Sequence, residues 1–210
     1  MLKKEYEVLA PFVNKPWMKA SFREIKNLTG KKSESYLYNS LKKYAKQNIL
    51  REELTGNSVI YSLSLDSLKA RNLLGYIAEH IAWSRKKIPY GDVEKLSKEI
   101  PTNFYTLIIT GSYANNTQKK SSDIDVVIIA DNSNETKKIY STLRQFCELN
   151  IPKIHLYVFT ASEFLQMLLS KEANYGKEIV KNSLLLSGAE NYYSIINEAI
   201  ENGFNDKKLS

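Results

Sequence analysis

The sequence lacks the features that mark secreted and membrane proteins. Its single cysteine, Cys147, cannot form an intramolecular disulfide, so nothing indicates an oxidising compartment. The first five residues, MLKKE, contain no apolar stretch of the signal-peptide kind. The longest apolar run, residues 126–130, is much shorter than the roughly 20 residues that span a bilayer. We therefore expect a cytoplasmic protein that does not enter a membrane.

The excess positive charge is concentrated in one part of the chain. Of the 210 residues, 43% are hydrophobic and 25% charged, the balance of a soluble globular protein with room for two small domains. The net charge is +7, and residues 1–65 carry twelve Lys/Arg against six Asp/Glu, whereas the rest carries eighteen against seventeen. A basic first third is expected if that part alone meets a polyanion, although a solvated lysine-rich surface explains the charge equally well.

Three helices are predicted in the first 50 residues. Apolar spacing of four, three and four predicts a first helix that ends before Lys15-Pro16, because a residue before proline avoids the helical conformation. Ser21 with Glu24 predicts a capping box at the start of the second helix, and Gly30 suits its end. The third helix is predicted over residues 33–48. The residues expected to face inward are Leu2, Tyr6, Leu9 and Val13 on the first helix, Phe22, Ile25 and Leu28 on the second, and Leu37, Leu41 and Tyr44 on the third.

A β-hairpin is predicted to follow these helices. Residues 50–54 and 59–65 have strand character, and the second segment alternates apolar and polar residues as a half-buried strand does. Gly56 and Asn57 lie in the turn between them. This order of helices and hairpin resembles the winged helix-turn-helix domain of DNA-binding regulators over residues 1–65. The resemblance implies duplex DNA as a partner; dimerisation or protein docking is the alternative use of the fold, and the uneven charge favours DNA.

The resemblance also implies that the third helix contacts DNA. Lysines would contact phosphates, while asparagine, serine and tyrosine would read base edges. The residues expected to face the DNA are Lys31, Lys32, Ser35, Tyr36, Asn39, Ser40 and Lys43.

Residues 66–88 are predicted to connect two domains through a helix over 68–86. Leu73, Ile77 and Ile81 lie along its apolar side. Such a helix can pair two subunits, which predicts a homodimer, or it can pack within one chain. Gly75 is unfavourable there, because glycine costs about 1 kcal/mol relative to alanine in a helix interior.

The strongest motif lies in the remaining segment, residues 89–210. A predicted buried strand over 104–110 leads directly into Gly111 and Ser112, which offer backbone N–H groups and a hydroxyl to a phosphate. A second apolar strand begins after Ser122 with Asp123 and Asp125. Residues two apart on a strand share a face, and two such carboxylates repel unless a cation lies between them. Magnesium held by carboxylates and substrate phosphates would remove the repulsion.

Together these residues resemble the DNA polymerase beta-like nucleotidyltransferases, in particular the minimal ones that serve as antitoxins to HEPN-type toxins. The resemblance covers roughly residues 66–210 and implies an α+β fold with a mixed sheet and C-terminal helices around 177–186 and 190–201. It implies that Gly111 and Ser112 bind the phosphates of NTP, most simply ATP. It also implies that Asp123 and Asp125 hold two Mg²⁺ ions. A HEPN-type toxin or another protein acceptor is an implied partner.

The sequence departs from this family's pattern at two places. Asn115 and Asn116 stand where the family motif has arginine and glycine. Lys119 and Lys120 could supply the lost positive charge, or they could be solvated loop residues. The family's third carboxylate should lie on a later strand, predicted here over 154–160, where His155 takes its place. His155 could be a metal ligand, a weak base or a strand residue without chemistry, and we favour the last two. Glu163 follows Thr160 at the spacing of a capping box, so we expect it to hold a helix start.

Two functions fit this sequence. The first is a DNA-binding protein with an active, magnesium-dependent nucleotidyltransferase domain that modifies a protein or small-molecule hydroxyl. The second is a regulator or antitoxin whose nucleotidyltransferase domain is catalytically degenerate and serves as a nucleotide sensor or dimerisation module.

Overall fold

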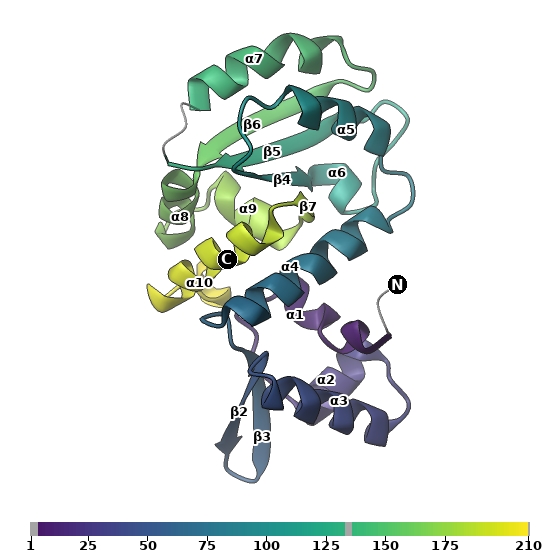
Figure 1. Cartoon of the computed structure of the whole chain (residues 1–210), viewed down its shortest axis with the longest axis vertical. Coiled ribbons are helices and arrows are strands. Elements are labelled where there is room, and N and C mark those ends of the chain that lie inside the picture. Colours follow the sequence, from purple (N-terminus) through teal and green to yellow (C-terminus); the bar gives the residue numbers. More distant parts are fainter. Residues whose placement is uncertain (1–3, 133–135, 210) are drawn as a thin grey trace.

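The computed structural model of the chain describes residues 4–132 and 136–209. Figure 1 shows the N-terminal third at one end of the molecule and a sheet with its helices at the other, with α4 between them. The N-terminal third contains η1 (Lys4–Val8), α1 (Ala10–Asn14), β1 (Ala20–Ser21), α2 (Phe22–Thr29), α3 (Glu34–Lys46), β2 (Leu50–Thr55) and β3 (Ser58–Leu63). The rest contains α4 (Leu68–Trp83), α5 (Tyr90–Glu99), β4 (Tyr105–Thr110), α6 (Gly111–Ala114), β5 (Ile124–Ala130), α7 (Thr136–Leu149), β6 (Ile154–Thr160), α8 (Ala161–Leu169), α9 (Tyr175–Lys181), β7 (Leu184–Ser187), α10 (Ala189–Glu201) and η2 (Asp206–Leu209).

The N-terminal third forms a three-stranded antiparallel sheet in the order β1-β3-β2 beside the 3₁₀ helix η1 and the helices α1, α2 and α3. The capping box of α2 is confirmed, because Glu24 Oε2 accepts a 2.7 Å bond from the Ser21 backbone N–H while the Ser21 hydroxyl accepts from the Glu24 N–H. Gly30 ends α2 with φ at 62°. The two-residue strand β1 had no signal of its own in the sequence, since its pairing partner is 40 residues away in β3.

Three expectations for this region are wrong. The predicted first helix is divided into η1 and α1, because Pro11 in the first turn of α1 has no N–H to continue a helix from η1. Leu28 is 58% exposed rather than inward-facing, and Ser40 is buried rather than outward-facing. The inward residues Leu37, Leu41 and Tyr44 of α3 are buried as predicted. Leu2 lies outside the described residues.

The second sheet has four strands in the order β6-β5-β4-β7 and is mixed, as predicted. Strands β4 and β5 are antiparallel, and β5 and β6 are parallel. One face, with Ile108 and Val127, belongs to the same core as α8, α9 and α10. The opposite face, with Ile109 and Val126, packs with α5 and α7.

The predicted helix over 177–186 is also wrong in its second half. Helix α9 ends at Lys181, and Leu184–Ser187 form strand β7, which pairs with β4. Leu185 packs into one core while Leu184 and Leu186 pack into the other. A strand buried on both faces carries a continuous apolar run, which periodicity alone does not distinguish from a buried helix segment.

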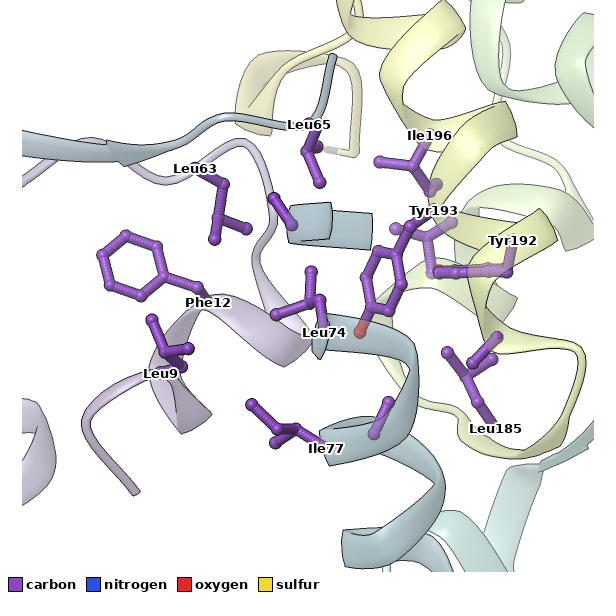
Figure 2. Close-up of a cluster of buried hydrophobic side chains, with 14 of the residues drawn as sticks. Leu9, Phe12, Leu63, Leu65, Leu74, Ile77, Leu185, Tyr192, Tyr193 and Ile196 are labelled. Carbon is purple, nitrogen blue, oxygen red and sulfur yellow. The ribbon is translucent and has the colours of Figure 1, made fainter. Parts of the chain in front are cut away.

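Helix α4 joins the two ends of the molecule through a shared core. Figure 2 shows Leu74 and Ile77 of α4 between side chains of α1 and those of α10. The Tyr193 hydroxyl donates a 2.9 Å bond to the Val13 carbonyl, which ties α10 to α1. The apolar side of α4 therefore packs within the chain. Within the described residues, no helix combines the length and the apolar character that crossing a membrane requires.

Candidate functional site

The candidate site lies where strands β4, β5 and β6 meet at one end of the sheet. Thr110, the last residue of β4, pairs with Asp125, and Asp125 pairs with His155 on β6. Asp123 immediately precedes β5. The register of the sheet therefore brings together a carboxylate pair and an imidazole that are 30 residues apart in the sequence.

His155 contacts both carboxylates. Its Nε2 lies 3.2 Å from Asp123 Oδ2, and its Nδ1 lies 3.4 Å from Asp125 Oδ1. All three side chains are partly open to solvent, at 46%, 40% and 27% exposed for His155, Asp123 and Asp125. The two acids thus lie side by side, as the spacing predicts, with the imidazole within contact distance of each.

The electrostatics of Asp125 favour a nearby cation. Burial raises the pKa of Asp125 above its ordinary value, an interaction with His155 opposes this, and the charge of Asp123 adds to it. A raised pKa means that the charged carboxylate is disfavoured in the free protein. A divalent cation at this position would favour the charged form again.

Position 111 requires glycine, because its backbone lies against the side chain of Asp125. Its backbone is left-handed, with φ at 64°, a conformation that L-amino acids with a side chain rarely adopt. A Cβ built on Gly111 would meet Asp125 Oδ2 at less than 3.0 Å. Glycine is therefore needed for both conformation and space, which the sequence motif alone could not distinguish.

Ser112 occupies the first turn of the short helix α6 and is partly exposed. Its hydroxyl makes no hydrogen bond with any residue in the described ranges, so it is free for a ligand. Lys119 and Lys120, in the loop that leads to β5, are exposed and form no ion pair within those ranges. Both lysines are close to Asp123 in the sequence, but no described ion pair holds either side chain in the site.

Tyr175 belongs to this site, although no motif in the sequence indicates it. Its hydroxyl shares a 3.0 Å hydrogen bond with the Thr110 hydroxyl, and its ring packs on Tyr157 with centroids 4.4 Å apart. Burial raises the pKa of Tyr175, and the charge of Asp125 contributes in the same direction. Tyr157 shares a strand face with His155, so its place could be predicted from period-two alternation, whereas the place of Tyr175 depends on tertiary packing.

Glu163 is not part of the site. Its Oε2 accepts a 2.8 Å bond from the Thr160 N–H, and its own N–H donates to the Thr160 hydroxyl at 3.1 Å. This is the predicted capping box at the start of α8, at the opposite end of β6 from His155.

The donor set fits magnesium only together with a phosphate ligand. The described residues contain no group of three or more His, Cys, Asp or Glu side chains arranged around one ion position. Magnesium usually retains waters and binds one or two carboxylates plus substrate phosphates, rather than a complete protein cage. Asp123 and Asp125, near the free Ser112 hydroxyl, are donors of that kind.

The residues expected to contact DNA differ in their exposure and in their ion pairs. Lys31 pairs with Glu7, and Lys43 Nζ lies 2.6 Å from Glu5 Oε2. Both acids lie in η1, so this segment neutralises the charges of two lysines that were expected to contact phosphates. Of the other expected residues, Lys32, Ser35 and Asn39 are exposed, Tyr36 is partly buried and Ser40 is buried.

Comparison with known proteins agrees with the fold of the second sheet. Residues 93–185 match the family model of the nucleotidyltransferase domain. The matched residues extend from α5 to β7 and include the five residues selected for the nucleotide site, which are Gly111, Ser112, Asp123, Asp125 and His155. No curated protein matches the chain. Among solved structures, similarity was found to a chain in a crystal structure of a toxin-antitoxin with AMP-PNP, with a TM-score of 0.40 and 15% identity over 54% of this chain and 86% of that chain.

Proposed function

We propose that this protein binds a nucleoside triphosphate, most simply ATP, with two Mg²⁺ ions, and transfers the nucleotidyl group to a hydroxyl. Its nucleotidyltransferase domain would comprise residues 89–210, with 66–88 as connector and 1–65 as a winged helix-turn-helix domain that binds duplex DNA. The observation that supports transfer chemistry best is the placement of Asp123 and Asp125 beside Gly111 and Ser112.

Each residue has a specific part in this proposal. Gly111 and Ser112 would bind the triphosphate, with the Ser112 hydroxyl donating to a phosphate oxygen. Asp123 and Asp125 would hold the metal ions, which neutralise charge on the transferring phosphate when bound. Rate enhancement in such sites comes mainly from positioning and charge stabilisation. His155 would contact the acceptor hydroxyl as a weak base.

The test is calorimetric titration of ATP in the presence of magnesium. Wild type should bind ATP, whereas Asp123→Asn and Asp125→Asn should bind it much more weakly at unchanged thermal stability. Glu172→Gln is the matched control, because Glu172 is exposed and its side chain makes no contact with the site. Equal affinity in wild type and both Asn variants would reject the metal assignment.

A second candidate function follows from His155. An imidazole stands where a third carboxylate would complete the site, and it contacts both remaining acids. The protein could then be a regulator or antitoxin that binds nucleotide without turning it over. Label from α-labelled ATP in any acceptor supports the enzyme; tight ATP binding without transfer supports the sensor.

DNA binding is proposed for the exposed face of α3. Lys32, Ser35 and Asn39 are open to solvent there, and a three-stranded sheet flanks the helices as in winged-helix proteins. Since Lys31 and Lys43 are paired with acids, we expect them to contribute less than the sequence suggested. A HEPN-type toxin is the proposed protein partner, and co-purification with the product of the adjacent gene would test it.

A further inference from the structure

A groove lies between the β2–β3 hairpin and helix α3 in the N-terminal third, at the end of the molecule away from the nucleotide site (Figure 1). It has a volume of ≈ 660 Å³. Pockets that hold small molecules usually measure about 300–1,000 Å³. The walls come from the start of α2, the first turns of α3 and the start of β3. The DNA-binding role proposed above uses Ser35 on one wall but assigns no ligand to the groove.

The groove is open because strand β1 is short. β1 consists of Ala20 and Ser21, which lie opposite Tyr61 and Ile60 of β3. After Ser21 the chain turns into α2, so within the described residues no strand pairs with Val59 on that side. The space beside the start of β3 is therefore bordered by helices instead of by a neighbouring strand.

Aromatic rings form much of the lining. Val59 and Tyr61 share a face of β3, and Tyr61 is only 2% exposed, so these two residues lie at the base of the groove. Phe22 of α2 and Tyr38 of α3 also line it, and Tyr38 is 50% exposed. Three rings around one space suit a planar aromatic ligand, because offset-stacked and edge-to-face contacts between rings are favourable.

The charge that faces the groove is positive. Arg23 lines the groove, is exposed, and forms no ion pair in the described part of the chain. The acid in the lining, Glu34, is paired with Lys26, whose hydrogen bond and charge hold the pKa of Glu34 below its ordinary value. Arg23 therefore leaves one uncompensated positive charge. A guanidinium group matches a carboxylate, because it can donate two parallel hydrogen bonds to the two oxygens.

We propose that the groove binds a small planar aromatic carboxylate, and that the bound molecule blocks the face of α3 proposed for DNA. The ring would contact Phe22, Tyr38 and Tyr61. The carboxylate would bind Arg23. Ser35 belongs both to the lining and to the residues expected to contact DNA, so the ligand and the duplex compete for it. The first part of this proposal is independent of the functions above, whereas the second part rests on DNA binding by α3.

The experiment titrates the full chain with 2-naphthoate by calorimetry. Two comparison probes are 2-naphthol, which has the rings without the carboxylate, and cyclohexanecarboxylate, which has the carboxylate without an aromatic ring. Arg23→Gln should weaken binding of 2-naphthoate by ~10-fold, as expected for the loss of a charge-assisted pair, and leave 2-naphthol unchanged. Tyr38→Ala should weaken binding of both naphthyl probes. Both residues are exposed, so both variants should fold as wild type does, and Lys46→Gln is the control because Lys46 is an exposed cation of α3 outside the groove.

A second measurement follows the anisotropy of a fluorescent DNA duplex in the presence of the probe. At a 2-naphthoate concentration of about ten times its Kd, competition should weaken duplex binding by wild type ~10-fold. The same concentration should have much less effect on Arg23→Gln, because this variant binds the probe poorly.

The outcomes separate the two parts of the proposal. No binding of 2-naphthoate to wild type, or equal affinity in wild type, Arg23→Gln and Tyr38→Ala, overturns the ligand site. Equal affinity of wild type for 2-naphthoate and cyclohexanecarboxylate overturns the choice of an aromatic ligand. Binding of 2-naphthoate that leaves duplex affinity unchanged overturns the competition with DNA. If wild type binds no duplex with or without the probe, the DNA-binding function fails, while the calorimetric result still decides the ligand site.

Discussion

Gly111 and Asp125 approach each other so closely that no Cβ fits at position 111. The ideal Cβ would overlap Asp125 Oδ2, and the backbone there has φ of 64°. The end of β4 and the start of β5 are thereby fixed together at the point where phosphate and metal would meet. This contact links the two halves of the sequence motif.

We expect Gly111→Ala to damage the site. A non-glycine residue in this left-handed conformation is strained by about 1–3 kcal/mol, and the displaced Asp125 carboxylate can no longer lie beside Asp123. Unfolding in urea should show reduced stability, and calorimetry should show loss of magnesium-dependent ATP binding. Gly91→Ala is the matched control, since a Cβ on Gly91 meets nothing within 4 Å. Unchanged ATP binding by Gly111→Ala would contradict the proposed geometry.

Gly75→Ala should destabilise the protein although alanine favours helices. A Cβ on Gly75 would lie 2.9 Å from the Glu190 backbone nitrogen, so α4 and α10 must move apart. The gain in helix propensity of about 1 kcal/mol should be smaller than this steric cost. A lower thermal midpoint than wild type is expected, and a higher one would show that the two helices separate easily.

Local signals in the sequence were reliable where the chemistry is local. Both capping boxes, at Ser21 and Thr160, satisfy backbone groups within three residues, and both are present. Strand β1 and the division between η1 and α1 were missed. Residues 184–187 have a pattern that predicts helix, but they form strand β7, because their conformation is decided by pairing with β4, more than 70 residues earlier. Propensity cannot represent such distant partners.

The same distinction separates the predictable from the unpredictable parts of the site. Asp123 and Asp125 could be selected because residues two apart on a strand share a face, and His155 because the family resemblance implies a third acid on the strand over 154–160. Tyr175 could not, because its contact with Thr110 spans 65 residues. The pairing of Lys43 with Glu5, 38 residues away, was likewise invisible in a count of charges.

For DNA binding, we expect Lys32 to contribute more than Lys43. Lys43 is already neutralised by Glu5, whereas Lys32 is exposed without an ion pair in the described residues. Lys32→Ala should weaken binding to all duplexes and lower the salt slope by about one, and Asn39→Ala should blur sequence preference more than it reduces affinity. Anisotropy titrations at several salt concentrations measure both effects. Salt-independent or undetectable binding at low salt would count against a DNA-binding role.

Association through the apolar side of α4 is not expected. Ile77 is fully buried within the chain, and Leu73 packs partly against the same core. Ile77→Ala should therefore reduce the free energy of unfolding by about 2–5 kcal/mol through cavity formation, without changing the state of association. Urea denaturation and sedimentation velocity separate the two effects. A wild-type dimer that this substitution converts to a folded monomer would show that α4 pairs subunits instead.

His155→Asp tests whether the site lacks a catalytic carboxylate or uses the imidazole of His155 in its place. A third carboxylate would add negative charge beside two cations and accept the proton of the attacking hydroxyl. An imidazole offers one neutral lone pair and cannot bridge two ions as a carboxylate can. We therefore expect wild type to bind ATP and to transfer its nucleotidyl group slowly or not at all. The substitution should increase single-turnover transfer by ~10²- to 10⁴-fold, the range of a positioned general base.

Circular dichroism must show that the variant is folded, because three clustered acids repel one another without metal. His155→Asn, which restores no base, should leave the rate low. If wild type is already fast and His155→Asp is slower, the imidazole itself is the functional group, and its contacts with Asp123 and Asp125 are those of a complete site.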